Sequence, residues 1–188
     1  NNKIKSPIIL ISSKKLLNLQ MKKLGFKNKI RLINSSKLKF YKLDNKTINL
    51  IDVNYNTDKA FEKISSKSNV FIKNSFELAF NTIRNNNISK FINGPISKKK
   101  FLKKNFLGIT EYISEKFLTK NTCMLIFNKE LSVCPITTHL PLKLVTKKIT
   151  KKNIINKVSL INNFYEKSFK FKPRIAILGL NPHCESIH

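Results

Sequence analysis

Short apolar runs alternate with helix-length amphipathic segments along this chain of 188 residues. Residues 7–11 and 29–33 are two such runs, and apolar side chains recur at helical spacing between them. Ser12 or Ser13 can cap the intervening helix, and Gly25 can end it. Because buried strands joined by a helix are typical of parallel sheets, the start of the chain predicts a β-α-β unit.

The same order recurs near the end of the chain. Residues 131–136 and 174–180 read as strands, and Thr150 can cap the helix between them. The apolar stripe of that helix comprises Ile154, Val158, Ile161 and Tyr165. The whole segment is long enough for a right-handed crossover between parallel strands. We therefore expect an α/β fold with a mixed sheet flanked by helices, in one domain over residues 1–188 that is incomplete at both ends.

The middle of the chain is less regular. Residues 37–51 predict two short strands, and residues 52–68 predict a polar loop. A helix is expected from Ser75, where apolar side chains begin to recur at helical spacing. The asparagines at 85–87 would end this helix, and residues 88–92 would return as a strand.

Three shorter elements are expected between residues 97 and 136. Ser97 can cap a short basic helix through Lys104, and Thr110 can cap another that ends at Leu118. Residues 123–136 then predict a hairpin whose turn is at residues 128–130.

The net charge of +27 raises the alternative of a basic nucleic-acid-binding protein. All but three of the 37 cationic residues are lysines, however, and they are scattered along the chain. Arginine is the residue preferred for bidentate phosphate and guanine contacts. We therefore expect a solvated basic surface without a specific nucleic-acid partner, and only weak salt-sensitive polyanion binding.

The three cysteines show no C-x-x-C spacing, which indicates a reducing compartment and favours a cytoplasmic protein. No apolar stretch approaches membrane-spanning length, so we expect no membrane partner.

Two histidines follow directly after predicted strands. His139 lies between two threonines and Leu-Pro, and His183 ends the turn Gly-Leu-Asn-Pro-His. Ligands of open α/β sheets bind beyond the carboxyl ends of strands, and neutral imidazole is the commonest metal ligand in proteins. A catalytic metal needs about three protein ligands. Because His188 is the one further histidine, we expect the third ligand outside this sequence or on a partner subunit.

Four motifs, which follow one another along the chain, extend the interpretation of the two histidines as a functional site. They are Asn93-Gly-Pro-Ile-Ser-Lys98, Gly108-Ile-Thr-Glu111, Thr137-Thr-His-Leu-Pro-Leu142 and Gly179-Leu-Asn-Pro-His183. As a set, with their spacing, they resemble the 4-hydroxythreonine-4-phosphate dehydrogenase family of pyridoxal phosphate biosynthesis. The first resembles that family's T-G-P-V-x-K segment, and the second its G-H-T-E segment. The resemblance covers essentially the whole chain, and it implies an isocitrate/isopropylmalate dehydrogenase-like fold.

The resemblance also implies an activity. It is the NAD-dependent oxidation and decarboxylation of 4-phosphooxy-L-threonine to 3-amino-2-oxopropyl phosphate, assisted by a divalent metal (Zn, Mg or Co). His139 and His183 match two of the family's three metal-binding histidines, and Thr110 matches a substrate-binding threonine. The family resemblance further implies a homodimer with the site at the subunit interface.

One position departs from the family pattern. Ile109 stands where the family has a substrate-binding histidine, and loss of such a contact costs about 1.5–3 kcal/mol. Two alternatives follow: a family member that acts on another phosphorylated hydroxy acid, or a relative that has lost activity. Lys98 would face the phosphate-bearing pocket or else belong to the solvated surface. The chain has no G-x-G-x-x-G fingerprint, so NAD follows from the resemblance alone.

Overall fold

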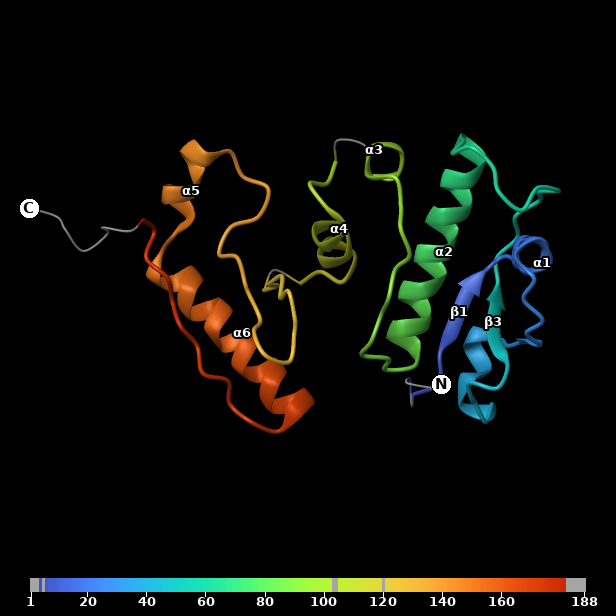
Figure 1. Ribbon diagram of the computed structural model, residues 1–188, viewed down its shortest axis with the longest axis horizontal. Helices are drawn as coiled ribbons and strands as arrows, with labels where there is room; N and C mark the ends of the chain where they lie inside the picture. Colours follow the sequence, from blue (N-terminus) through green and yellow to red (C-terminus); the bar gives the residue numbers. More distant parts are fainter. Residues whose placement is uncertain (1–3, 5, 103–104, 120, 182–188) are drawn as a thin grey trace, which may run out of the picture. The chain divides into compact units, whose positions relative to one another are not determined.

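The protein is represented by a computed structural model that divides into two compact units, a first unit Asn1–Tyr112 and a second unit Ile113–His188, each considered by itself. The residues that the structure describes are 4, 6–102, 105–119 and 121–181. The elements in chain order are β1 Ile9–Ser12, α1 Lys14–Leu24, β2 Ile30–Leu32, the 3₁₀ helix η1 Ser35–Phe40, β3 Ile48–Asp52, α2 Ser66–Asn85, α3 Lys98–Phe101, α4 Ile109–Lys116, α5 Leu142–Lys148 and α6 Lys151–Phe169 (Figure 1).

The first unit contains a parallel sheet of three strands in the order β1-β3-β2. Leu50 at the centre of β3 pairs with Leu10 of β1 and with Leu32 of β2. Helix α2 lies alongside β1, and α1 lies on the other side of the strands (Figure 1). The α/β class is confirmed. Within the described residues the ladder is parallel rather than mixed, and the antiparallel pairing of Ile126 with Val133 is an isolated bridge in the second unit.

The helix signals at the start of the chain are confirmed. The side chain of Ser13 accepts a hydrogen bond from the backbone N–H of Leu16, which caps α1. Gly25 ends the helix in the left-handed conformation, with φ of 75° and a backbone hydrogen bond to Met21. This conformation suits glycine because it has no Cβ.

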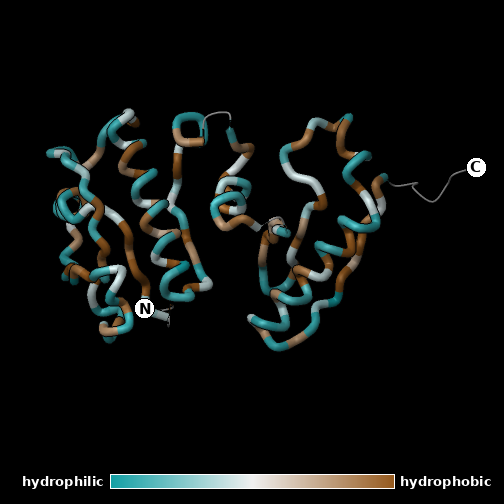
Figure 2. Tube along the Cα trace, turned by 180° about the vertical axis from the view of Figure 1, so that it is seen from behind, coloured by the Kyte–Doolittle hydropathy of each residue, from teal (hydrophilic) through white to brown (hydrophobic). Residues whose placement is uncertain are grey.

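The core of the first unit lies around β3 and α2. Leu50 and Phe80 have no exposed surface. The rings of Phe76 and Tyr112 contact each other edge to face, with centroids 5.6 Å apart, and both rings lie within 6 Å of Phe80. Figure 2 shows hydrophobic residues along the strands and at intervals on the helices. Burial of this apolar surface is the main stabilising term for the unit.

A buried amide fixes the middle of the sheet. Asn49 of β3 is 1% exposed. Its Oδ1 accepts hydrogen bonds from the Arg31 guanidinium of β2, and its Nδ2 donates to the carbonyl oxygens of Ile8 and Asp44 at 3.0 and 2.7 Å. All the polar atoms of this side chain therefore have partners, as a buried polar group requires.

Three expectations for the first unit are wrong. The first of the two strands expected in residues 37–51 is replaced by η1, because Leu38 packs into the core cluster through a 3₁₀ turn. Helix α2 begins at Ser66 instead of Ser75, because a capping box between Ser65 and Ser68 starts it within the expected loop. Residues 88–92 form no strand; Ile92 is 86% exposed, and the structure pairs this segment with no other.

The second unit is built around α6. Thr150 caps this helix as expected, and its apolar stripe is half-buried. Residues 174–180 are not a strand, which is a correction. Leu178 is 88% exposed, and no described strand lies beside this segment to satisfy its backbone. Helix α5 was not expected from the sequence. None of the described helices is long and apolar enough to cross a membrane.

Candidate functional site

His139 lies in a constrained turn before α5. Its φ is 54°, in the left-handed region that few residues other than glycine adopt. Pro141 follows and occupies the N-cap position of α5. The His139 side chain belongs to an exposed residue. Such backbone conformations concentrate at functional sites, because the surrounding structure must hold them in place.

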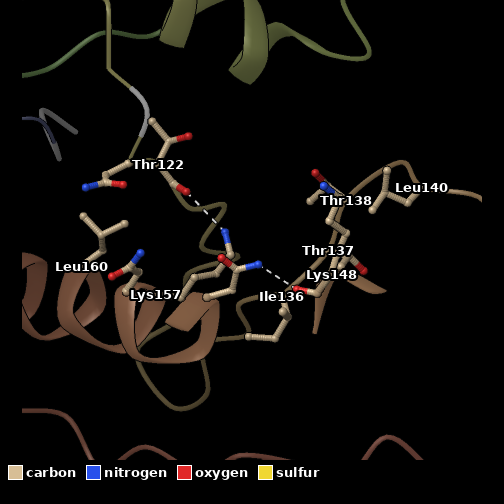
Figure 3. Close-up of a pocket in the computed structure, with 11 residues that line it drawn as sticks. Thr122, Ile136, Thr137, Thr138, Leu140, Lys148, Lys157 and Leu160 are labelled. Carbon is tan, nitrogen blue, oxygen red and sulfur yellow. Dashed lines mark hydrogen bonds between the residues drawn. The ribbon is translucent and has the colours of Figure 1, made fainter. Parts of the chain in front are cut away.

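The residues around His139 border a cavity of about 280 Å³ in the second unit (Figure 3). Thr137, Thr138 and Leu140 of the histidine motif line one part of it. The other lining residues come from the segment before the hairpin, from the end of the hairpin, from α5 and from α6, and they are Asn121, Thr122, Ile136, Lys148, Asn153, Asn156, Lys157 and Leu160. In Figure 3, Thr138 and Leu140 lie across the cavity from Leu160 of α6.

The lining is rich in hydrogen-bond donors. The Lys157 ammonium donates to the carbonyl oxygen of Thr122 at 3.3 Å, and the Asn153 amide donates to the carbonyl oxygen of Lys148 at 2.7 Å. These bonds join α6 to the segment before the hairpin and to the last residue of α5. An ammonium group has three N–H donors, so Lys157 retains capacity for a further partner. This cavity suits a polar or anionic ligand.

The cavity residues of α6 were not apparent from the sequence. Asn153, Asn156, Lys157 and Leu160 are spaced 3, 1 and 3 apart, which places them on one face of the helix. The sequence signal that could have identified these residues is the polar face that lies next to the apolar stripe of the helix. It could not be distinguished from solvated surface in so lysine-rich a chain.

The predicted substrate residues lie at the beginning of α4. Ile109 and Thr110 are half-buried and directly follow the buried Gly108. Thr110 is the second residue of α4 and not its cap, because Gly108 O accepts the N–H of Tyr112 at 3.3 Å and starts the helix earlier. Oε2 of Glu111 is buried and has no hydrogen-bond partner among the described residues.

Lys98 is the first residue of α3 and is exposed. Ser97 precedes it at the N-cap position, but its side chain makes no cap hydrogen bond. Lys103 and Lys104, at the expected end of this helix, lie outside the described residues. The exposure of Lys98 agrees with the solvated-surface alternative.

The structure does not test the proposed histidine pair, because His183, Cys184 and His188 lie outside the described residues. Thr110 and Lys98 belong to the first unit and His139 to the second. Over residues 4–181, apart from the undescribed positions, no group of three or more His, Cys, Asp or Glu side chains is arranged to hold a metal ion. His139 therefore remains a single candidate ligand in this part of the chain.

Comparisons with known proteins agree on one family. The 4-hydroxythreonine-4-phosphate dehydrogenase of Sulfurihydrogenibium sp. (strain YO3AOP1) is 38% identical over 140 residues, which cover 73% of this chain and 42% of the relative. The enzyme of the same name from Aquifex aeolicus is 33% identical over 166 residues, which cover 81% of this chain and 52% of that protein. The chain thus spans about half the length of these relatives.

Solved structures show the same fold. The 4-hydroxythreonine-4-phosphate dehydrogenase of Klebsiella pneumoniae matches with a TM-score of 0.77 at 19% identity, covering 96% of this chain and 56% of that one. The Burkholderia phymatum enzyme matches with a TM-score of 0.76 at 22% identity, covering 94% and 54%.

The family model for the pyridoxal phosphate biosynthetic protein PdxA matches residues 3–186, nearly the whole sequence and all four motifs. The chain belongs to the PdxA family.

Proposed function

We propose that the protein containing this chain is an NAD-dependent dehydrogenase that oxidises and decarboxylates 4-phosphooxy-L-threonine to 3-amino-2-oxopropyl phosphate. Family membership supports the reaction class. The observation that carries the proposal is the histidine motif, whose two threonines line a donor-rich cavity while His139 stands beside them in a left-handed turn.

A divalent cation fits this proposal at His139. The imidazole belongs to an exposed residue in a fixed turn, so a ring nitrogen is accessible to an ion. His183 is the proposed second ligand, and the third would come from sequence beyond this chain. When bound, Zn, Mg or Co supplies Lewis-acid polarisation of the substrate hydroxyl. Thr137 and Thr138 would orient the bound substrate from the cavity wall.

Candidate contacts to a phosphorylated substrate are present in each unit, taken by itself. The hydroxyl of Thr110 is the proposed donor in the first unit. In the second unit, Lys148, Lys157 and the cavity amides suit a phosphate group, because they carry N–H donors and positive charge. We assign no residue to NAD, since no phosphate-cradling glycine motif is present. A homodimer that completes the site is part of the same proposal.

The decisive test is His139→Ala in the complete protein. We expect NADH formation with 4-phosphooxy-L-threonine to fall by more than about 100-fold, because even groups that only orient metal ligands are worth 10–100-fold. Bound metal, measured by elemental analysis, should fall in parallel.

Lys143→Ala is the matched control, because this exposed α5 residue lies four positions further along the same segment. It should retain activity within about twofold, as surface substitutions have small effects. Full activity and full metal content in His139→Ala would refute the assignment of the ligand.

Ile109 favours a second candidate, a family member acting on another phosphorylated hydroxy acid. Its half-buried side chain at the start of α4 cannot hydrogen-bond a substrate. Ile109→His should raise kcat/KM for 4-phosphooxy-L-threonine by about 10-fold or more if the protein has lost a contact worth at least 1.5 kcal/mol. An unchanged value, together with turnover of another phosphorylated hydroxy acid, would favour the second candidate.

A further inference from the structure

Two cysteines lie on one face of the hairpin that leads into the candidate site. The bridge between Ile126 and Val133 sets its register, and each N–H donates to the other residue's carbonyl oxygen, at 2.9 and 3.0 Å. Side chains alternate between faces along an extended chain, and opposed residues share a face. Cys123 is three positions before Ile126, and Cys134 is one position after Val133. Both cysteines therefore face away from the side on which Ile126 and Val133 lie.

The exposure of these four residues agrees with that placement. Ile126 and Val133 are 61% and 52% exposed. Cys123 and Cys134 are both half-buried and both carry free thiols. The bridge places Leu125 opposite Cys134, so the two cysteines are diagonal neighbours across the hairpin.

The face that carries the cysteines is turned toward α6. Cys123, Leu125 and Phe127, at every second position, line a cavity of about 440 Å³. The wall of this cavity contributed by α6 consists of Leu160, Ile161 and Phe164. Cys123 is therefore open to a small molecule entering the cavity.

The two thiols interact electrostatically. Burial raises the pKa of Cys134 above its ordinary value, and the neighbouring Cys123 thiol raises it further, while the charge of Lys157 opposes the rise. Cys134 therefore stays protonated near neutral pH, and Cys123, which lines the cavity, is the better placed of the two for initial attack.

We infer that Cys123 and Cys134 form a reversible thiol–disulfide pair, with a disulfide such as oxidised glutathione as the oxidant. The Cys123 thiolate attacks one sulfur of the oxidant, forms a mixed disulfide and releases one glutathione thiolate. Cys134 gives its proton to solvent and attacks the sulfur of Cys123, which releases the second glutathione. Two protein thiols are thereby oxidised to one disulfide, and one glutathione disulfide is reduced to two thiols.

The bond would join two segments that border the candidate site. Thr122, next to Cys123, and Ile136, two residues after Cys134, both line the 280 Å³ cavity. The disulfide would restrict the separation of these two walls. It is a modification site distinct from the proposed metal and substrate residues, so it stands or fails independently of the proposed reaction.

Tryptic peptide mapping tests the pair in the complete protein. Cleavage after Lys120, Lys129 and Lys143 separates Cys123 in peptide 121–129 from Cys134 in peptide 130–143, and Cys184 falls in a third peptide beginning at Ile175. After incubation of the folded protein with oxidised glutathione and alkylation of free thiols, we expect loss of both separate alkylated peptides. A single disulfide-linked species should replace them, and dithiothreitol should restore them.

Three controls make the result specific. Cys184→Ser should leave the linked species unchanged, whereas Cys123→Ser should abolish it. The same treatment in concentrated urea should give less of this link, because the folded hairpin supplies the proximity. The inference is overturned if the folded protein keeps both peptides separate or carries only separate glutathione adducts. It is also overturned if either cysteine forms a disulfide with Cys184 as often as Cys123 forms one with Cys134.

Discussion

The two units of this chain differ in how they bury their side chains. Among the described residues, every buried side chain lies in the first unit, from Ser13 to Tyr112. The described residues of the second unit are half-buried or exposed, although this unit holds the histidine motif and both cavities. The packed core and the histidine motif with its cavities therefore lie in different units of the chain.

Aromatic contacts at its surface help to hold the second unit together. Phe127 stacks on Phe169, with ring centroids 5.2 Å apart, and Phe164 meets Tyr165 edge to face at 5.7 Å. Phe164 is 42% and Phe169 is 41% exposed. Such pairs contribute about 0.5–1.5 kcal/mol each beyond burial, which is less than a closed core provides.

The sharpest test of this difference is a phenylalanine truncation in each unit. Phe80→Ala should lower the free energy of unfolding by about 3–5 kcal/mol, because the side chain is completely buried and leaves a cavity. Phe164→Ala should cost only about 1 kcal/mol, since much of that ring already contacts water. Urea unfolding followed by circular dichroism measures both. Equal losses would show that burial in the two units is energetically alike.

Helix caps provide a second, smaller comparison. Ser13 is 2% exposed, and its hydroxyl both accepts from Leu16 N and donates to Tyr55 O. Thr150 is exposed. Among the described residues, its side chain accepts a hydrogen bond only from Asn153 N, at 3.2 Å. We expect Ser13→Ala to cost about 1–2 kcal/mol and Thr150→Ala about 0.5–1 kcal/mol. A reversed order in thermal unfolding would contradict the dependence on burial.

The smallest effect is expected from a carboxylate in the loop between β3 and α2. Thr57 and Tyr55 donate hydrogen bonds to Glu62, and these bonds lower its pKa below the ordinary value of 4.5. Because the folded-state pKa is lowered, the stabilisation is present above pH 4.5 and is lost as the pH falls through the folded-state value. Glu62→Gln should therefore destabilise the protein near neutral pH and have a smaller effect in acid.

Glu130→Gln, an exposed change in the hairpin turn of the second unit, is the control for charge alone. Thermal unfolding over a pH series should show the pH-dependent difference for Glu62→Gln and none of that size for the control. A constant difference across the series would exclude linkage through this carboxylate.

The parts of the fold that depend on local chemistry could be predicted from the sequence. The Ser13 and Thr150 caps, the Gly25 terminus and the strands around Ile9 and Ile30 are all in place. The caps and the helix terminus follow from side chains within a few residues of the helix end, whereas the two strands were evident from their apolar composition. The cap at Ser65 was missed because the reciprocal bonding of two serines looks like an ordinary polar loop in sequence.

Strands that need distant partners could not be predicted as well. Residues 88–92 and 174–180 have the apolar composition of strands, but in the described structure neither pairs with another segment. Composition records only the tendency of a segment to be extended, whereas a ladder requires a neighbour with free N–H and C=O groups. The candidate site likewise has a part that could be predicted from the sequence and a part that could not. The turn at His139 was evident, but the α6 face with Asn153 and Lys157 required the fold.

The buried amide of Asn49 has a consequence for how the chain assembles. If β3 slid by a single position along its neighbours, this side chain would swing to the opposite face and lose Arg31 and both carbonyl oxygens at once. A misaligned sheet would then enclose an amide with nothing to bond, a penalty of about 1–3 kcal/mol or more. The single polar residue Asn49 among aliphatic neighbours thus disfavours the shifted strand register relative to the native one.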